Sequence, residues 1–309
     1  MRTSSWICGV LFAFALAGCS DDKVKLAPTA SGSALATSAP KTATSKKFVV
    51  DTGASTVGFM MEAPDEKIRG RAPSSAEGYL NIDPKDLSQT NGNIVVDIDK
   101  LELVQRKKKD GQFTEEVKEP KQNDHARAWL EIDDSTPEAV RKEHRRVEFR
   151  IDSISDLSEK DLSKLSGAER TVTFTASGEF LLHKRTSKKT VKMKATFTFE
   201  GDTPTAVVVK TESPLAVSLA EHDVRPRDAF GKLAAKTLDD LGSKVAKEAQ
   251  VELEIRLMLE GGKPAPPAPA PTVTAASSAT PTATMEAGSA APSASAAPSA
   301  APSASAGKK

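Results

Sequence analysis

The feature that most constrains the fold is a strict alternation of apolar and polar residues in three segments. From Thr171 to Leu182 the even positions are Val, Phe, Ala, Gly, Phe and Leu, whereas most odd positions are Thr, Ser or Glu. The same alternation runs from Thr190 to Glu200 and from Val251 to Leu259. Successive side chains of a β-strand point to opposite faces, so a period of two is typical of strands with one buried face. The three segments therefore predict long strands.

Weaker runs with the same period bring the number of predicted strands to about eight or nine. They cover residues 47–51, 55–62, 76–83, 91–104, 146–153 and 206–219. Helix signals are few. Thr136-Pro137-Glu138 opens a short predicted helix that ends near Arg145, and residues 232–249 have apolar residues at helical spacing. Residues 156–165 are expected to form a surface turn. Antiparallel strands with occasional helices over their ends predict a sandwich or a closed barrel.

Two segments contain too few large apolar residues to compensate for the entropy of ordering a backbone. They are residues 20–46 and residues 261–309, which consist mainly of Ala, Ser, Thr, Pro and Lys. We expect the first to be a disordered tether, about 30 Å long on average as a coil, and the second to be a disordered tail. This leaves residues 47–260 as one β domain. The net charge of +1 gives no reason to expect a nucleic-acid partner.

The N-terminus has the pattern of a lipoprotein signal peptide over residues 1–19. Arg2 precedes a short apolar run, which is too short to span a bilayer. Leu16-Ala17-Gly18-Cys19 then resembles the lipobox of bacterial lipoproteins. These residues predict lipidation of Cys19 and attachment to a membrane of the cell envelope. Ser20, in place of an aspartate, favours the outer membrane, with the protein facing the periplasm.

The cysteines and the absence of known motifs restrict the chemistry. Cys8 lies in the predicted signal peptide, so Cys19 is the single cysteine left after cleavage, and its sulfur is committed to lipid. A disulfide, a cysteine nucleophile and a cysteine-ligated metal are thereby excluded for the mature chain. The sequence contains no Gly-x-Ser-x-Gly, no His-Glu-x-x-His and no phosphate-binding glycine loop. We therefore do not expect an enzyme.

Several motifs, taken in order, resemble the YceI-like family of bacterial periplasmic proteins. They are Phe48–Asp51 with Ser55–Phe59, Gly78–Asp83, Asn123–Leu130, Val147–Ile154, and Ser177–His183 with Lys189–Phe199. The resemblance implies a lipocalin-like antiparallel barrel of about eight strands that binds a polyisoprenoid lipid. The chain departs from the family pattern in the turn at residues 183–186, which lacks glycine, and in the longer charged segment at residues 105–122. Residues 222–228 enlarge the region before the last strand.

The apolar strand faces predict the residues that would line such a barrel. The predicted lining is Phe149, Ile151, Val172, Phe174, Phe180, Val191, Met193, Phe197, Phe199, Leu253 and Ile255. They would hold an isoprenoid lipid, a quinone or a similar hydrophobic ligand. The alternative is that the same residues fill a solid core, because periodicity does not distinguish the two.

Two polar clusters are candidates for the mouth of the barrel. His125 and Arg127, beside Asp124, would contact a polar headgroup or would form a hydrogen-bonded structural corner. His222 and Arg225 would bind an anionic group or would belong to a salt-bridged loop. Residues 106–111 are expected to form a solvated hairpin tip, with contact to anionic lipid headgroups as the alternative. The four histidines lack the spacing of a metal motif, so no metal site is predicted.

Two functional hypotheses follow. In the first, the chain is a membrane-anchored envelope lipoprotein that binds, carries or sequesters a polyisoprenoid or similar molecule in an apolar barrel. In the second, the barrel is packed solid, and the lipoprotein has a structural or interaction role. In the second hypothesis the Pro-Ala-Ser tail and the charged loops contact envelope partners, which the sequence does not identify. No cofactor other than such a lipid is predicted.

Overall fold

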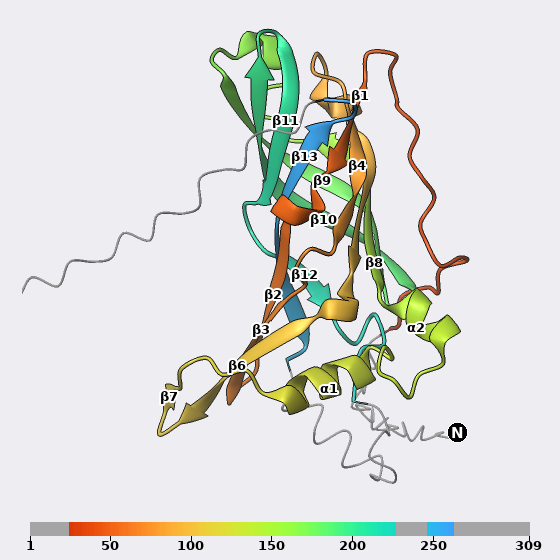
Figure 1. The fold of residues 1–309 in the computed structure, drawn as a ribbon, viewed down its shortest axis with the longest axis vertical. Helices are drawn as coiled ribbons and strands as arrows, with labels where there is room; N and C mark the ends of the chain where they lie inside the picture. The colour runs from red at the N-terminus through yellow and green to blue at the C-terminus, as the bar shows by residue number, and fades with distance from the viewer. Residues whose placement is uncertain (1–24, 227–245, 263–309) are drawn as a thin grey trace, which may run out of the picture. The chain divides into compact units, whose positions relative to one another are not determined.

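The computed structural model describes residues 25–226 and 246–262 (Figure 1). Cys19, the predicted signal peptide and the predicted tail after Gly262 lie outside the described residues, as does most of the helix predicted over residues 232–249. The last two positions of that helix, Glu248 and Ala249, begin a strand instead. No helix in the described part of the chain is long and apolar enough to cross a membrane.

The described residues form thirteen strands and two α-helices, so the fold is mainly β. The strands are β1 (Lys46–Val50), β2 (Thr56–Glu62), β3 (Glu66–Arg71), β4 (Ala76–Ile82), β5 (Asn91–Asp97), β6 (Glu102–Lys109), β7 (Gln112–Phe113), β8 (Arg146–Ser155), β9 (Glu169–Leu182), β10 (Arg185–Glu200), β11 (Thr203–Thr211), β12 (Leu215–Ser218) and β13 (Glu248–Leu259). The helices are α1 (Pro120–Trp129) and α2 (Glu138–His144), and four short 3-10 helices are η1 (Thr52–Ala54), η2 (Leu87–Gln89), η3 (Ile98–Lys100) and η4 (Leu162–Lys164).

Eight of the strands close into an antiparallel barrel. Their order is β1-β4-β5-β8-β9-β10-β11-β13, and the pairing of β1 with β13 completes the circle. In that closing pair Phe48 is opposite Leu259 and Val50 is opposite Leu257. Phe48 and Leu257 are fully buried, so the seam of the barrel is sealed by apolar packing. The predicted fold class is confirmed.

A second branch of the sheet leaves the barrel at the first half of β13. There β13 pairs with β2, and the order continues through β3 and β6 to β7 (Figure 1). On its other side β13 pairs with β12. α1 packs on β6. This end of the barrel is therefore built from helix as well as from strand.

The long strands β9 and β10 carry the clearest alternation in the sequence. Across this hairpin Val172 is opposite Ala195, Phe174 is opposite Met193, and Ala176 is opposite Val191. The hairpin turns through His183 and Lys184, whose φ angles are 49° and 58°. Two-residue hairpin turns with positive φ at both positions usually contain asparagine and glycine, so the pair costs backbone strain here.

Other predicted elements need correction. The strand predicted over residues 91–104 is two strands, β5 and β6, separated by η3, and the run at 206–219 is likewise divided into β11 and β12. β3 and α1 were not predicted. The helix predicted from Thr136 to about Arg145 is confirmed by α2.

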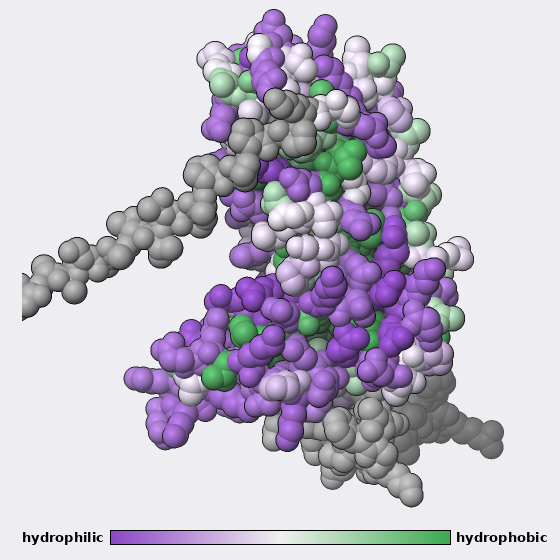
Figure 2. Space-filling model, in the orientation of Figure 1, coloured by the Kyte–Doolittle hydropathy of each residue, from purple (hydrophilic) through white to green (hydrophobic). Residues whose placement is uncertain are grey.

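The predicted hairpin tip at residues 106–111 is also confirmed. Asp110 and Gly111 turn the chain between β6 and β7 with φ angles of 51° and 82°. Residues 107–111 are exposed, and Figure 2 shows hydrophilic residues over this projecting part of the molecule. Arg106 is the exception among the four consecutive basic residues, because it is partly buried and its Nε donates to the carbonyl of Thr114 at 2.7 Å.

Residues 25–45, which we call the N-terminal strap, differ from the disordered tether predicted over residues 20–46. The strap runs along the outside of the barrel from the level of α2 to β1, as the red end of the trace in Figure 1 shows. At its start the N–H of Ala27 donates to the carbonyl of Glu221 at 2.9 Å, and Ala27 is 5% exposed. Thr29 forms an antiparallel bridge with Arg185.

Side chains on the outer face of β4, β5 and β8 hold the middle of the strap. Asn81 and Tyr79 donate to the carbonyl of Ser38, each at 3.0 Å. The N–H of Leu35 donates to the carboxylate of Glu148 at 3.1 Å. These bonds use the backbone of the strap and need no apolar side chain from it. A composition-based prediction of disorder does not account for such contacts, so it is wrong for residues 25–45.

Candidate hydrophobic binding site

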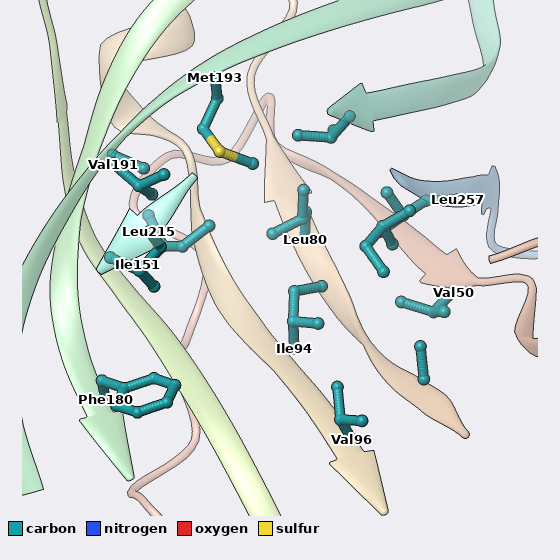
Figure 3. Packing of buried hydrophobic residues seen from close by; sticks show 14 of the residues in the cluster. Val50, Leu80, Ile94, Val96, Ile151, Phe180, Val191, Met193, Leu215 and Leu257 are labelled. Carbon is teal, nitrogen blue, oxygen red and sulfur yellow. The ribbon is translucent and has the colours of Figure 1, made fainter. Parts of the chain in front are cut away.

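A cavity of about 200 Å³ lies inside the barrel. Its walls come mainly from β2, β8, β9 and β13, and β4, β5, β6, β10, β11, β12 and α1 contribute one or two residues each. Figure 3 shows part of the interior, with Val191 and Met193 of β10 on one side and Leu80 and Ile94 on the other. The alternation of the strands therefore surrounds a space with apolar side chains.

The structure places most of the predicted lining residues at this cavity. Those that line it are Phe149, Ile151, Phe174, Phe180, Val191, Met193, Leu253 and Ile255. Val172, Phe197 and Phe199 do not line it, although they belong to the same apolar core. They lie toward the far end of the β9–β10 hairpin, where the guanidinium of Arg170 stacks 3.7 Å from the ring centre of Phe199. The barrel is thus packed at that end and hollow along the rest of the hairpin.

Several lining residues were missed in the sequence. α1 contributes Ala126 and Trp129, and Leu130 follows immediately at the C-cap. The three positions i, i+3 and i+4 share one face of a helix. β2 contributes Val57, Phe59 and Met61 at alternate positions. The helical spacing and the alternation are both visible in the sequence, but each segment is short. A short apolar run does not show whether its side chains line a cavity or fill a solid core.

Phe59 is accommodated by a glycine on the neighbouring strand. Phe59 and Gly70 are directly opposite each other on β2 and β3. A Cβ atom added to Gly70 would lie 2.1 Å from Cζ of Phe59, which no real contact allows. Gly70 therefore leaves room for the ring that forms part of the cavity wall.

The cavity offers little polar chemistry. Among the described lining residues, the polar ones are Thr90, Glu148 and Thr211. The carboxylate of Glu148 is engaged beneath the strap, where it accepts hydrogen bonds from Asn93 at 2.7 Å and from Leu35 at 3.1 Å. The guanidinium of Arg146 also lies 2.9 Å from it. Such a cavity favours a molecule that is apolar over most of its surface.

A smaller pocket of about 50 Å³ lies against α1. It shares Met61, Leu103, Ala126 and Trp129 with the main cavity, so these four side chains separate the two spaces. His125, a predicted mouth residue, lines this pocket together with Gln122 and Glu66. The Gln122 amide donates to Glu66 at 3.2 Å and to Gln105 at 2.8 Å.

The other predicted mouth residues do not gather beside His125. Arg127 donates to the carbonyl of Asp99 at 2.6 Å and to that of Ile132 at 2.8 Å, so it forms the structural corner named as the alternative. Arg225 forms an ion pair with Asp223 at 2.8 Å in its own loop. Nothing in the sequence distinguishes a mouth residue from a structural corner or a salt-bridged loop.

His222 lies inside the protein. Its side chain is fully buried, with Nδ1 3.3 Å from the carbonyl oxygen of Leu182 and Nε2 3.2 Å from the hydroxyl of Ser187. The ring meets Phe180 edge to face at 5.4 Å. Burial lowers the pKa of His222 below its usual value, because the charged form loses hydration. A neutral imidazole here supports the cavity wall behind Phe180.

The fold and the site define a closed antiparallel barrel with an apolar interior. No family model and no curated protein matches the sequence. One similar solved structure is a polyisoprenoid binding domain from Saccharophagus degradans implicated in plant cell wall breakdown, with a TM-score of 0.43 and 14% identity. Another is BcnA from Burkholderia cenocepacia, with a TM-score of 0.41 and 14% identity.

These similarities extend over 69% and 67% of this chain and over 98% of each of the other two chains. At such TM-scores and identities they do not identify what this chain binds.

Proposed function

We propose that the chain is an envelope lipoprotein, anchored through lipid on Cys19, that binds, carries or sequesters a polyisoprenoid or a similar extended apolar molecule. The cavity of about 200 Å³ with its apolar lining is the observation that supports this function best. The sequence motifs supply the polyisoprenoid class through their resemblance to the YceI-like family, and the cavity supplies a place for an apolar chain.

The size of the cavity limits what it accepts without rearrangement. A cavity of about 150 Å³ lined by Leu, Ile and Phe stays dry and takes up benzene. By the same ratio, about 200 Å³ holds roughly eight carbons of an apolar chain. A longer chain must displace lining side chains or extend outside. Met61 and Met193 line the wall and are unbranched, so they can change rotamer at little cost.

Chain length is expected to set the affinity. Each buried methylene contributes roughly 0.8 kcal/mol, whereas association costs on the order of 4 kcal/mol or more. Micromolar binding corresponds to about 8 kcal/mol, so it requires about fifteen buried carbons, the number in three isoprene units. Under this proposal a single isoprene unit binds too weakly to detect, and a chain of three or more units binds measurably.

The strap would orient the barrel on the membrane. From Cys19 to the start of the strap at Lys25 the chain spans at most about 22 Å, because an extended residue covers up to about 3.6 Å. Ala27 is bonded to Glu221, close to the β9–β10 turn. A lipid on Cys19 would therefore keep the end of the barrel that carries α1 and this turn near the bilayer.

Native mass spectrometry on a Cys19→Ser variant, which retains every described residue, tests ligand binding. We expect a mass adduct that organic extraction identifies as an isoprenoid or another lipid, or uptake of a prenol with three isoprene units but not of one with a single unit. A clean protein mass with no uptake of prenols or quinones would favour the structural or interaction role. Membrane fractionation of the wild type and of Cys19→Ser tests the anchor separately.

A further inference from the structure

Three side chains that are distant in sequence converge where α1, α2 and the β9–β10 turn meet. Glu131 follows α1, His144 is the last residue of α2, and His183 is the first residue of the turn. Nε2 of His183 lies 2.9 Å from Oε2 of Glu131, and Nδ1 of His144 lies 3.5 Å from the same oxygen. The ring centres of the two histidines are 4.1 Å apart. One ligand atom from each residue lies within 4.8 Å of the other two.

Two hydrogen-bond acceptors lie against the ring nitrogens of His183. Its Nδ1 lies 3.1 Å from the carbonyl oxygen of His222, and its Nε2 faces the Glu131 carboxylate. Both neighbours are acceptors, whereas a neutral imidazole has one N–H group. When Nδ1 donates to the carbonyl, the lone pair of Nε2 points at a carboxylate oxygen. A proton or a metal ion between these two atoms makes the contact favourable.

The burial of the two imidazoles suits a metal site. His183 is 4% exposed and His144 is 9% exposed, so packing holds both rings in fixed positions. Histidines that bind metals usually donate their second N–H to a carbonyl or carboxylate, as Nδ1 of His183 can do toward His222. The Glu131 side chain is 36% exposed, which gives an ion access from solvent.

The spacing of the ligand atoms also agrees with metal coordination. Zinc binds imidazole nitrogen and carboxylate oxygen at about 2.0–2.2 Å, so two ligand atoms of a tetrahedral site lie about 3.3 Å apart. The two separations in the structure, 2.9 Å and 3.5 Å, are on either side of this value. Two imidazoles and one carboxylate suit zinc and its neighbours in the first transition series, whereas calcium and magnesium prefer oxygen ligands alone.

We propose that Glu131, His144 and His183 bind one divalent transition-metal ion of the Zn²⁺ class, with water in the fourth position. The ion would join α1, α2 and the β9–β10 turn. Leu130, immediately before Glu131, lines the cavity, so the ion would also fix that part of the cavity wall. This site does not depend on the proposed ligand. It reverses the expectation from sequence, which considered only regular spacing of the histidines.

Metal analysis of the purified full chain, made without a histidine tag and stripped with a chelator, tests the proposal. After one equivalent of Zn²⁺ is added at pH 7.5 and the protein is gel-filtered, we expect one ion per chain and a higher melting temperature. Co²⁺ bound in place of Zn²⁺ should show the visible absorption bands of a cobalt ion coordinated by nitrogen and oxygen ligands. Affinity should fall as pH decreases, because protons compete with the metal ion for the ligand nitrogens.

Substitutions identify the site. Glu131→Gln and His183→Asn should each weaken Zn²⁺ binding at least tenfold, whereas His125→Asn, a histidine outside the cluster, should leave it unchanged. Asparagine tolerates the positive φ at position 183, which favours folding of that variant. If a variant does not fold, the Co²⁺ spectrum of the wild type decides the question. No retained ion, or binding that persists unchanged in both variants, would overturn the proposal.

Discussion

Filling the cavity should distinguish a hollow barrel from a solid one through the sign of a stability change. Ala176 is fully buried on β9, lines the cavity and is opposite Val191, which also lines it. Ala195 provides a matched control on the neighbouring strand. It is 2% exposed and is opposite Val172, and neither of these two residues lines the cavity. The pairs Ala176–Val191 and Val172–Ala195 differ mainly in whether they face empty space.

The expected magnitudes follow from burial. Ala176→Leu adds three carbons, which gain about 2.4 kcal/mol if they enter empty apolar space. Ordering the leucine side chain subtracts about 0.5–1 kcal/mol. We therefore expect the free energy of unfolding to rise by about 1.5 kcal/mol. Ala195→Leu inserts the same carbons into packed core and should lower it by about 1–3 kcal/mol through strain.

Equilibrium unfolding in urea measures both changes, provided that the free energy of unfolding falls with urea concentration at the same slope in both variants and the wild type. Native mass spectrometry of the same proteins should show less bound apolar ligand in Ala176→Leu than in Ala195→Leu. If Ala176→Leu destabilises the protein as much as the control does, position 176 faces no empty space. The proposed binding function would then lose the observation that supports it best.

Three further predictions concern other parts of the structure. Burial opposes ionisation of Asp83, but hydrogen bonds from the Thr44 and Thr42 hydroxyls and from the backbone N–H groups of Lys85 and Asp86 lower its pKa. The ionised carboxylate thus stabilises the docked strap above about pH 4. Proteolysis of residues 25–45 should therefore accelerate as the pH falls through the lowered pKa of Asp83. Equal rates of proteolysis at pH 6 and pH 2.5 would contradict this prediction. Burial lowers the pKa of His222, so the unfolded state binds a proton there more readily and the free energy of unfolding should decrease as pH falls below 6.5. This decrease should be smaller in His222→Gln. Parallel profiles of stability against pH for the two proteins would argue against this role of His222. Gly70→Ala should force the ring of Phe59 to move and lower the free energy of unfolding in urea by about 1–3 kcal/mol. It should also weaken binding of the apolar ligand. An unchanged urea midpoint would show that the ring adapts freely.

The strands could be predicted wherever one face is buried over a long run. β9, β10 and β13 each bury an alternating face, so their period was visible in the sequence. β3 was missed because Glu66–Arg71 has one large apolar residue, Ile68, and its pairing with β2 and β6 is a tertiary effect. α1 was missed because its mean hydropathy is low and none of its residues is fully buried.

For the candidate site, the sequence predicts which side chains point into the barrel but not which of them line the cavity. Met193 and Phe197 both point inward from β10, yet only Met193 lines the cavity. Which inward residue meets empty space depends on how far the opposite walls are apart, and a period of two carries no information on that distance. The cluster of Glu131, His144 and His183 is likewise a product of topology, because three separate elements bring it together.

The strap shows that a peptide poor in apolar residues can be held by the surface beneath it. Asn81, Asn91 and Asn93 lie on the outer face of β4 and β5, and they are only 2%, 5% and 4% exposed. Asparagine is depleted in strands because its amide competes for backbone hydrogen bonds, so three within thirteen residues demand a specific partner. Here the partner is a second backbone: Asn91 donates to the carbonyl of Ala39 at 2.7 Å, and Asn81 donates to that of Ser38. The signal for an ordered strap therefore lay in β4 and β5, in asparagines 43 and 52 residues away from their partners in the segment whose composition suggested disorder.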